Sequence, residues 1–207
     1  ASVLKLVQQA RLNGRIVRTA LTKEAWQAIH NLWLALDKSL KRPINARDLP
    51  QILSQVRQGN ELVRGALDST MLRNDIFNFI QLGTLVERGD NTARLISARH
   101  FLFLPSPSVL HQKNGLAHWD MVMSAIGAKR AYNWLHKGRM EGPRVLNFLI
   151  ADQRMPRSLI YCYTNIVRQV DALEKAYGRS YETSRLARAI CDDFDAQKIG
   201  ELVNFGL

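Results

Sequence analysis

The sequence has few cysteines, few prolines and no long apolar run, and each scarcity excludes a class of protein. Two cysteines in 207 residues are too few for a disulfide-stapled extracellular scaffold. Six prolines and 12 glycines, without any low-complexity tract, exclude collagen-like and linker-dominated chains. The longest apolar runs, such as residues 145–151, are far too short to cross a bilayer. With 46% hydrophobic residues, the chain instead has enough apolar surface to build a sizeable core.

The expected compartment follows from two further absences. The first residues carry no basic segment followed by an apolar stretch and a small-residue cleavage site, so nothing marks the chain for export. Cys162 and Cys191 lie on amphipathic stretches without an adjacent histidine, so we expect core thiols and not nucleophiles. Free, mostly buried thiols suit a reducing compartment. We therefore expect a cytoplasmic protein.

Charge is abundant and mainly of one sign, since 29 basic residues face 18 acidic ones and leave a net charge of +11. A basic excess raises affinity for nucleic acid when the charges gather in one patch. Here they are spread over several short clusters, which is typical of solvated faces, ion pairs and helix C-terminal charges. We do not expect nucleic acid as the partner, although binding driven by net charge stays open as an alternative.

Apolar residues recur with a period near that of an α-helix along almost the whole chain, and no stretch alternates as a strand does. The pattern predicts an all-α protein, a single domain over residues 1–207. Short connections favour an antiparallel bundle of about seven to nine helices around a long central helix. The expected helices cover residues 2–21, 22–42, 48–67, 71–104, 116–126, 128–137, 142–151, 156–177 and 180–193.

Local signals set these boundaries. Ser2, Thr22 and Ser180 are expected as N-caps, and Pro156 as the first residue of its helix. Residues 68–70 are expected to form a turn and cap before the long helix, which Pro105-Ser106-Pro107 would end. Residues 105–115 are the one long loop that the sequence predicts.

The long central helix contains an unusual set of charges, because Glu87, Asp90 and Arg94 share an arc with apolar residues. Buried charges need partners, and Asp90 can pair with Arg94 one turn later, whereas Glu87 and Asp90 repel each other. We expect a cation from the first helix, Arg15 or Arg18, to complete a buried network. A ligand or catalytic site with Glu87 and Asp90 as paired carboxylates stays open as the alternative.

Residues 81–96, which contain Glu87-Arg88, resemble the signature of the Alpha-E family, named for its Glu-Arg motif. Further stretches agree with that family in the expected order over most of the chain. They are Asn13-Gly14-Arg15-Ile16-Val17-Arg18 with Glu24-Ala25-Trp26, then Ala131-Tyr132, then Phe148-Leu149 with Asp152 and Pro156-Arg157-Ser158-Leu159.

The sequence also departs from the family pattern. Gly14 and Gly89 stand where the family usually has alanine, and His30 stands where it has asparagine. Family members usually carry the motif in a tandem duplication, whereas this sequence has one clear copy. The resemblance therefore implies that the chain is the second half of the usual arrangement, and does not show whether it is a natural short form.

The resemblance implies an accessory role in bacterial peptide synthesis or modification, with an ATP-grasp amide ligase and a transglutaminase-like protein as partners and a peptide or acidic ligand. The alternative is a stand-alone enzyme that uses Glu87 and Asp90. The sequence contains no phosphate-binding loop, nucleophile elbow or metal-ligand spacing, so we expect no cofactor and no metal, and it gives no oligomeric state. The candidate motif and binding residues are Arg15, Arg18, Glu87, Arg88, Asp90, Thr92, Arg94, Asp152 and Arg157.

Overall fold

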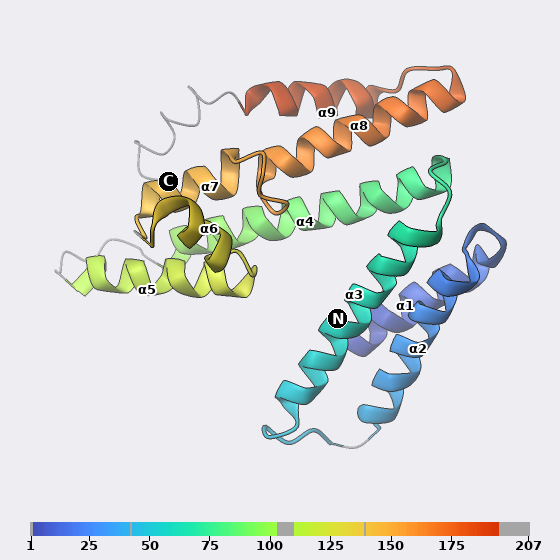
Figure 1. Cartoon of the computed structure of the whole chain (residues 1–207), viewed down its shortest axis with the longest axis horizontal. Helices are drawn as coiled ribbons and strands as arrows, with labels where there is room; N and C mark the ends of the chain where they lie inside the picture. The colour runs from blue at the N-terminus through green and yellow to red at the C-terminus, as the bar shows by residue number, and fades with distance from the viewer. Residues whose placement is uncertain (1, 42, 103–109, 139, 195–207) are drawn as a thin grey trace. The chain divides into compact units, whose positions relative to one another are not determined.

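A computed structural model describes residues 2–41, 43–102, 110–138 and 140–194 (Figure 1). Over these residues the regular structure consists of nine α-helices and one short 3-10 helix, with no strand. The predicted all-α fold is therefore confirmed. None of the described helices is both long enough and apolar enough to span a membrane. The chain divides into two compact units, Ala1–Phe77 and Asn78–Leu207, and the interpretation as one domain stays a prediction.

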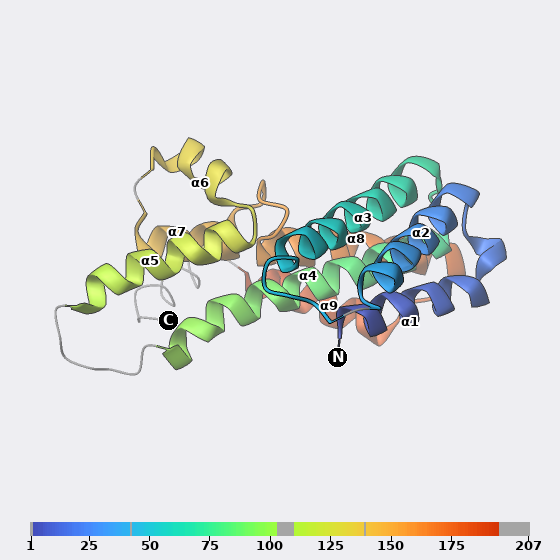
Figure 2. The same ribbon diagram turned by 90° about the horizontal axis from the view of Figure 1, so that it is seen from below.

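In the first unit α2 packs against both α1 and α3 (Figure 2). The buried Gly14 of α1 lies close to the start of α2, since a Cβ there would stand 3.4 Å from Leu21 and 3.6 Å from the Trp26 ring. Ala25 and Leu36 are the fully buried residues of α2. The elements are α1 (Val3–Ile16), the 3-10 helix η1 (Arg18–Ala20), α2 (Lys23–Ser39) and α3 (Leu49–Thr70).

Two of the predicted helix starts in this unit are confirmed at the level of the cap. The side chains of Ser2 and Thr22 accept hydrogen bonds from the main-chain N–H groups of Lys5 and Ala25, both at 3.3 Å. Each bond satisfies an amide that the helix itself leaves unpaired.

The predicted turn at residues 68–70 is wrong, because α3 continues to Thr70. The hydroxyls of Ser69 and Thr70 donate to the carbonyls of Gly65 and Ala66 at 2.6 and 2.7 Å, so these groups are satisfied inside the helix. The next helix starts at Asp75 and not at residue 71.

The second unit contains the rest of α4 and five more helices. Its main core lies where α5, α6 and α7 pack, and α4 adds Leu95 and Ile96 to it. Trp119, Tyr132 and Phe148 are the largest buried side chains there. The elements are α4 (Asp75–Leu102), α5 (Leu110–Ala125), α6 (Lys129–His136), α7 (Gly142–Ala151), α8 (Leu159–Tyr177) and α9 (Glu182–Asp193).

A smaller cluster connects α4 with α8 and α9, through Leu85, Ile166, Val170 and Ala187. α9 runs antiparallel to α8, after Gly178 ends α8 in the left-handed conformation at φ 65° (Figure 1). Glycine adopts that conformation without steric cost. The same signal ends the two predicted helices before Gly127 and Gly138, at φ 68° and 75°.

Three boundaries in the second unit differ from the prediction. Pro156 precedes α8 and is not its first residue, because Ser158 is the N-cap and accepts from Tyr161 N at 3.1 Å. Ser180 does not cap α9, since its hydroxyl donates to Glu174 instead, at 2.7 Å.

The third difference is the predicted loop over residues 105–115, which is too long. α5 already begins at Leu110, because one glycine, Gly115, lowers helix stability by about 1 kcal/mol without ending the helix. The predicted helix end at Pro105-Ser106-Pro107 lies outside the described residues.

Candidate functional site

The Glu-Arg motif lies on α4 where this helix meets the segment before α8. Arg88 Nη1 donates to the main-chain carbonyl of Pro156 at 3.2 Å. The Thr92 hydroxyl, 1% exposed, lies 2.8 Å from the carbonyl of Arg157 and 3.2 Å from that of Arg88. Two stretches that the sequence singled out, far apart along the chain, therefore meet through side-chain to main-chain hydrogen bonds.

The segment before α8, which accepts these bonds, also has hydrogen bonds among its own residues. Asp152 accepts from the main-chain N–H and the guanidinium of Arg154, and this guanidinium lowers the pKa of the Asp152 carboxyl. The buried Ser158 hydroxyl donates to the Asp152 carbonyl at 2.7 Å. Asp152 thus pairs with Arg154, while the half-buried Arg157 contributes its carbonyl to Thr92.

α4 and α8 lie close together at Gly89. A Cβ built at Gly89 would stand 3.6 Å from Cys162 Cβ, an ordinary van der Waals contact. Cys162 is fully buried, as expected, and burial raises the pKa of its thiol against the opposing effect of Arg88 and Arg157. A thiol in this environment is a packing group and a poor nucleophile. Cys191 is half-buried.

The expected buried network around Glu87 and Asp90 is wrong within the second unit. Glu87 is exposed and accepts from Asn91 at 2.6 Å, within its own helix. Asp90 and Arg94 form the predicted pair at 2.7 Å, but their side chains are 53% and 76% exposed.

Glu87 and Asp90 are exposed because α4 buries a different face from the one that the sequence predicted. α4 buries Leu85, Gly89 and Thr92, which follow one another at helical spacing toward α8. The predicted arc of apolar residues lies on another side of α4, where Phe79 is 57% exposed. Glu87 and Asp90 share that arc.

Of the two arginines predicted to reach α4, Arg18 has a partner in its own unit. Arg18 Nη1 donates to the carbonyl of Leu21 at 3.2 Å, and its guanidinium lies 5.6 Å from the centre of the Trp26 ring. Arg18 thereby holds the connection from α1 to α2, and Arg15 is exposed. The predicted pairing of Arg15 or Arg18 with the carboxylates of α4 would join the two units and stays a prediction.

A row of stacked rings in the first unit was not predicted. His30 lies between Trp26 and Trp33, with ring centres 5.7 and 5.9 Å away. Arg11 donates through Nε to His30 Nδ1 at 3.0 Å and lies 4.1 Å from the centre of the Trp33 ring. The i, i+4 and i, i+3 spacing of the three rings is the signal that could have found it.

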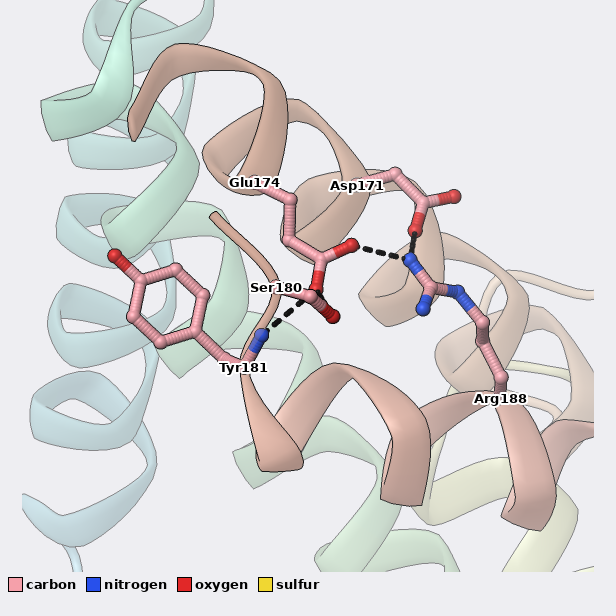
Figure 3. Close-up of polar contacts among 5 residues, drawn as sticks. All are labelled: Asp171, Glu174, Ser180, Tyr181 and Arg188. Atoms are coloured by element: carbon pink, nitrogen blue, oxygen red, sulfur yellow. Dashed lines mark hydrogen bonds and ion pairs between the residues drawn. The ribbon is translucent and has the colours of Figure 1, made fainter. Parts of the chain in front are cut away.

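A second polar cluster, also missed from sequence, connects α8 with α9 (Figure 3). Arg188 bonds to Asp171 at 2.5 Å and to Glu174 at 2.6 Å. Glu174 also accepts from the Ser180 hydroxyl at 2.7 Å and from Tyr181 N at 2.9 Å. The bond from Arg188, followed by those from Ser180 and Tyr181, lowers the pKa of Glu174 to about 2. The cluster fixes how α9 returns along α8.

Beside the Glu-Arg motif the second unit has an open apolar groove with a volume of about 460 Å³, formed by α4, α8 and α9. Val86 and Asp90 line its α4 side, Leu186 and Ile190 its α9 side, and Ile166 its base. The described residues include no group of three or more His, Cys, Asp or Glu side chains that could hold a metal ion.

Together these residues separate into two sets. Arg88, Thr92 and Asp152 maintain the fold where α4 meets α8, whereas Glu87 and Asp90 face solvent beside an apolar groove. An exposed acidic and apolar surface of this kind is suited to binding another molecule.

The comparisons with known proteins agree with the motifs. The sequence profile of the Alpha-E family, a predicted alpha-helical domain with a conserved ER motif, matches residues 1–207. No curated protein and no solved structure matches the chain.

Proposed function

Because the chain belongs to the Alpha-E family, we propose that it is a helical accessory module of a bacterial peptide synthesis or modification system. In this proposal it acts in the cytoplasm beside an ATP-grasp amide ligase and a transglutaminase-like protein. Its own part is to bind, through the α4 surface, a partner or the peptide that the partners modify.

One observation carries the proposal, namely that the two residues of the Glu-Arg motif have different surroundings. Arg88 bonds to the chain's own Pro156 carbonyl, whereas Glu87 is exposed and bonds only to Asn91 among the contacts described for it. A residue that makes no contact across its own fold contributes little to stability, so its place in the motif fits an intermolecular contact.

The enzyme alternative has weaker support. Two carboxylates that act as acid and base need different environments, one of them dry enough to keep a proton. Glu87 and Asp90 instead lie one helical turn apart on one exposed face. That arrangement suits recognition of a cationic group more than proton transfer.

Co-purification tests the proposal directly. The full chain, tagged, is produced together with the ligase and the transglutaminase-like protein encoded in its own genome. We expect a complex that Glu87→Lys weakens by about tenfold, since the change places a cation where an anion is recognised. Asp192→Lys, at an exposed acid on α9, is the matched control and should leave the complex unchanged.

Two results would overturn this function. One is failure to recover either partner with the unmodified chain. The other is turnover of a peptide substrate by the isolated protein that Glu87→Gln abolishes without lowering the melting temperature, because that result makes Glu87 a catalytic group.

A further inference from the structure

The groove between α4 and α9 continues beyond the stretch next to Asp90. A second stretch of about 370 Å³ shares Thr183 with the first and is lined by Phe79 on α4 and Tyr177 at the end of α8. α8 lines both stretches, with Ile166 in the first and Val170 in the second. Figure 1 shows α8 running between α4 and α9. From Phe79 to Ala93 the α4 wall is about 21 Å long at 1.5 Å per residue.

The walls of this groove are apolar and open to solvent. Val86 and Phe79 on α4 are 56% and 57% exposed, and Leu186 on α9 is 59% exposed. Large apolar side chains that share one concave surface are typical of a protein-binding site.

The charges differ between the two ends. Among the described residues that line the first stretch, Asp90 carries the only charge, and among those that line the second it is Arg179. The groove therefore favours an occupant with a cation at one end and an anion at the other. A helix lying along it with its N-terminus toward Asp90 also has a macrodipole of the right direction.

We propose that this groove binds an amphipathic helix of a partner protein, with its basic N-terminal turn at Asp90 and its acidic C-terminal turn at Arg179. The inference rests on the proposed function, because it names the kind of segment through which the partner docks. α4, α8 and α9 supply three helices, and the occupant completes a four-helix arrangement.

Arg94 sets how a basic occupant engages Asp90. It already pairs with that carboxylate at 2.7 Å, and its side chain is 76% exposed. A lysine from the occupant therefore competes with Arg94 for Asp90, or shares the carboxylate with it. Removal of Arg94 should accordingly strengthen binding, which a purely apolar groove would not show.

The test uses a fluorescein-labelled synthetic helix of about 16 residues, long enough to match the groove. It has leucines along one face, lysines in its first turn and glutamates in its last turn. Two control peptides carry the terminal charges exchanged, or asparagine in place of leucine. All three carry the same side-chain staple on the solvent face so that they are equally helical, because the terminal charges of the first peptide oppose its own macrodipole. Fluorescence anisotropy with the full chain at low salt gives the Kd, and the first peptide should bind more tightly than both controls.

Variants of the protein should change its affinity for the peptide in opposite directions. Leu186→Glu should weaken binding by about tenfold or more, since it places a charge against the leucine face. Asp90→Asn should weaken binding by about two- to fivefold, and Arg94→Gln should strengthen it by a similar factor. Met121→Glu, at an exposed apolar residue of α5, and Asp192→Asn are the matched controls and should leave Kd unchanged.

Several results would overturn the inference. Equal affinity for the peptide with exchanged charges, with no effect of Asp90→Asn on either peptide, removes the role of the charges. Equal affinity that Asp90→Asn lowers for both peptides overturns the stated direction of the helix. If the peptide fails to bind and sedimentation shows a dimer that Leu186→Glu dissociates, the occupant is a second copy of the chain. If the peptide fails to bind a monomeric chain, no helix of this chemistry docks there.

The proposed function and the proposed docking groove can be tested separately. Co-purification that Glu87→Lys abolishes and Leu186→Glu leaves intact would keep the accessory role and reject this groove as the docking site. Peptide binding with the expected charge preference, but without recovery of the ligase or the transglutaminase-like protein, would keep the groove and reject those partners.

Discussion

The Thr92 hydroxyl on α4 donates a hydrogen bond to the main-chain carbonyl of Arg157, 2.8 Å away. This bond connects the helix that carries the Glu-Arg motif with the segment that leads into α8. Thr92 is buried, and water has little access to replace this bond. Arg88 adds a second bond, to the Pro156 carbonyl. The bonds of Thr92 and Arg88 to the Arg157 and Pro156 carbonyls form a clamp between α4 and the segment before α8. Glu87, the other residue of the motif, takes no part in this clamp and bonds within its own helix.

Replacement of Thr92 by valine should destabilise the protein by about 1–2 kcal/mol, because the shape of the buried side chain is kept while the Arg157 carbonyl loses a donor. Thermal unfolding followed by circular dichroism measures the change. Thr84→Val is the matched control on the same helix, since the Thr84 hydroxyl bonds only to its own helix, at Ile80 O, among the contacts described for it. Equal losses for the two variants would contradict the clamp.

Arg88 and Glu87 should respond differently to substitution. Arg88→Met removes the bond to the Pro156 carbonyl and should cost about 0.5–1.5 kcal/mol. Glu87→Gln keeps an acceptor for Asn91 on an exposed surface and should change stability by less than about 0.5 kcal/mol. Urea denaturation of both variants gives the two values. A larger loss for Glu87→Gln would show that Glu87, and not Arg88, supports the fold.

How much the sequence could predict differs between the fold and the site. Helix periodicity and caps such as Ser2 and Thr22 predicted the all-α fold, because these signals are local. The family motifs drew attention to Arg88, Thr92 and Arg157, whose hydrogen bonds connect α4 with the segment before α8. Their mutual contact could not be predicted, since it depends on how α8 packs on α4.

The burial of Glu87 and Asp90 was predicted wrongly for a physical reason. A helix that is apolar on several sides offers more than one candidate buried stripe. α4 buries the stripe that contains Leu85, Gly89 and Thr92, and this stripe faces α8. Periodicity alone does not predict against which of these stripes a neighbouring helix packs.

Gly89→Ala should stabilise the protein by about 1 kcal/mol, the gain in helix propensity, with an added methyl contact to Cys162. The 3.6 Å contact leaves room for the methyl group. Gly83→Ala is the matched control, since a Cβ there meets no atom within 4 Å and its gain is from propensity alone. A lower melting temperature for Gly89→Ala would mean that α4 and α8 lie closer than described.

The Arg188 cluster predicts a specific dependence of stability on pH. The folded-state pKa of Glu174 is lowered to about 2 from its ordinary value of 4.5, mainly by Arg188. The unfolded chain therefore binds a proton before the folded protein does as the pH falls. The stability that Glu174 contributes is fully present above pH 4.5 and is lost between about pH 4.5 and 2.

Glu174→Gln should abolish this part of the acid dependence, because glutamine has no proton to gain. Stability measured by urea denaturation should fall less steeply for Glu174→Gln than for the unmodified chain between about pH 4.5 and 2. Asp152, whose pKa is also lowered, keeps its own contribution in both proteins and so does not alter their difference. Asp192→Asn, on the exposed side of α9, should retain the original slope. Parallel curves for Glu174→Gln and the unmodified chain would show that Arg188 does not hold Glu174 in solution.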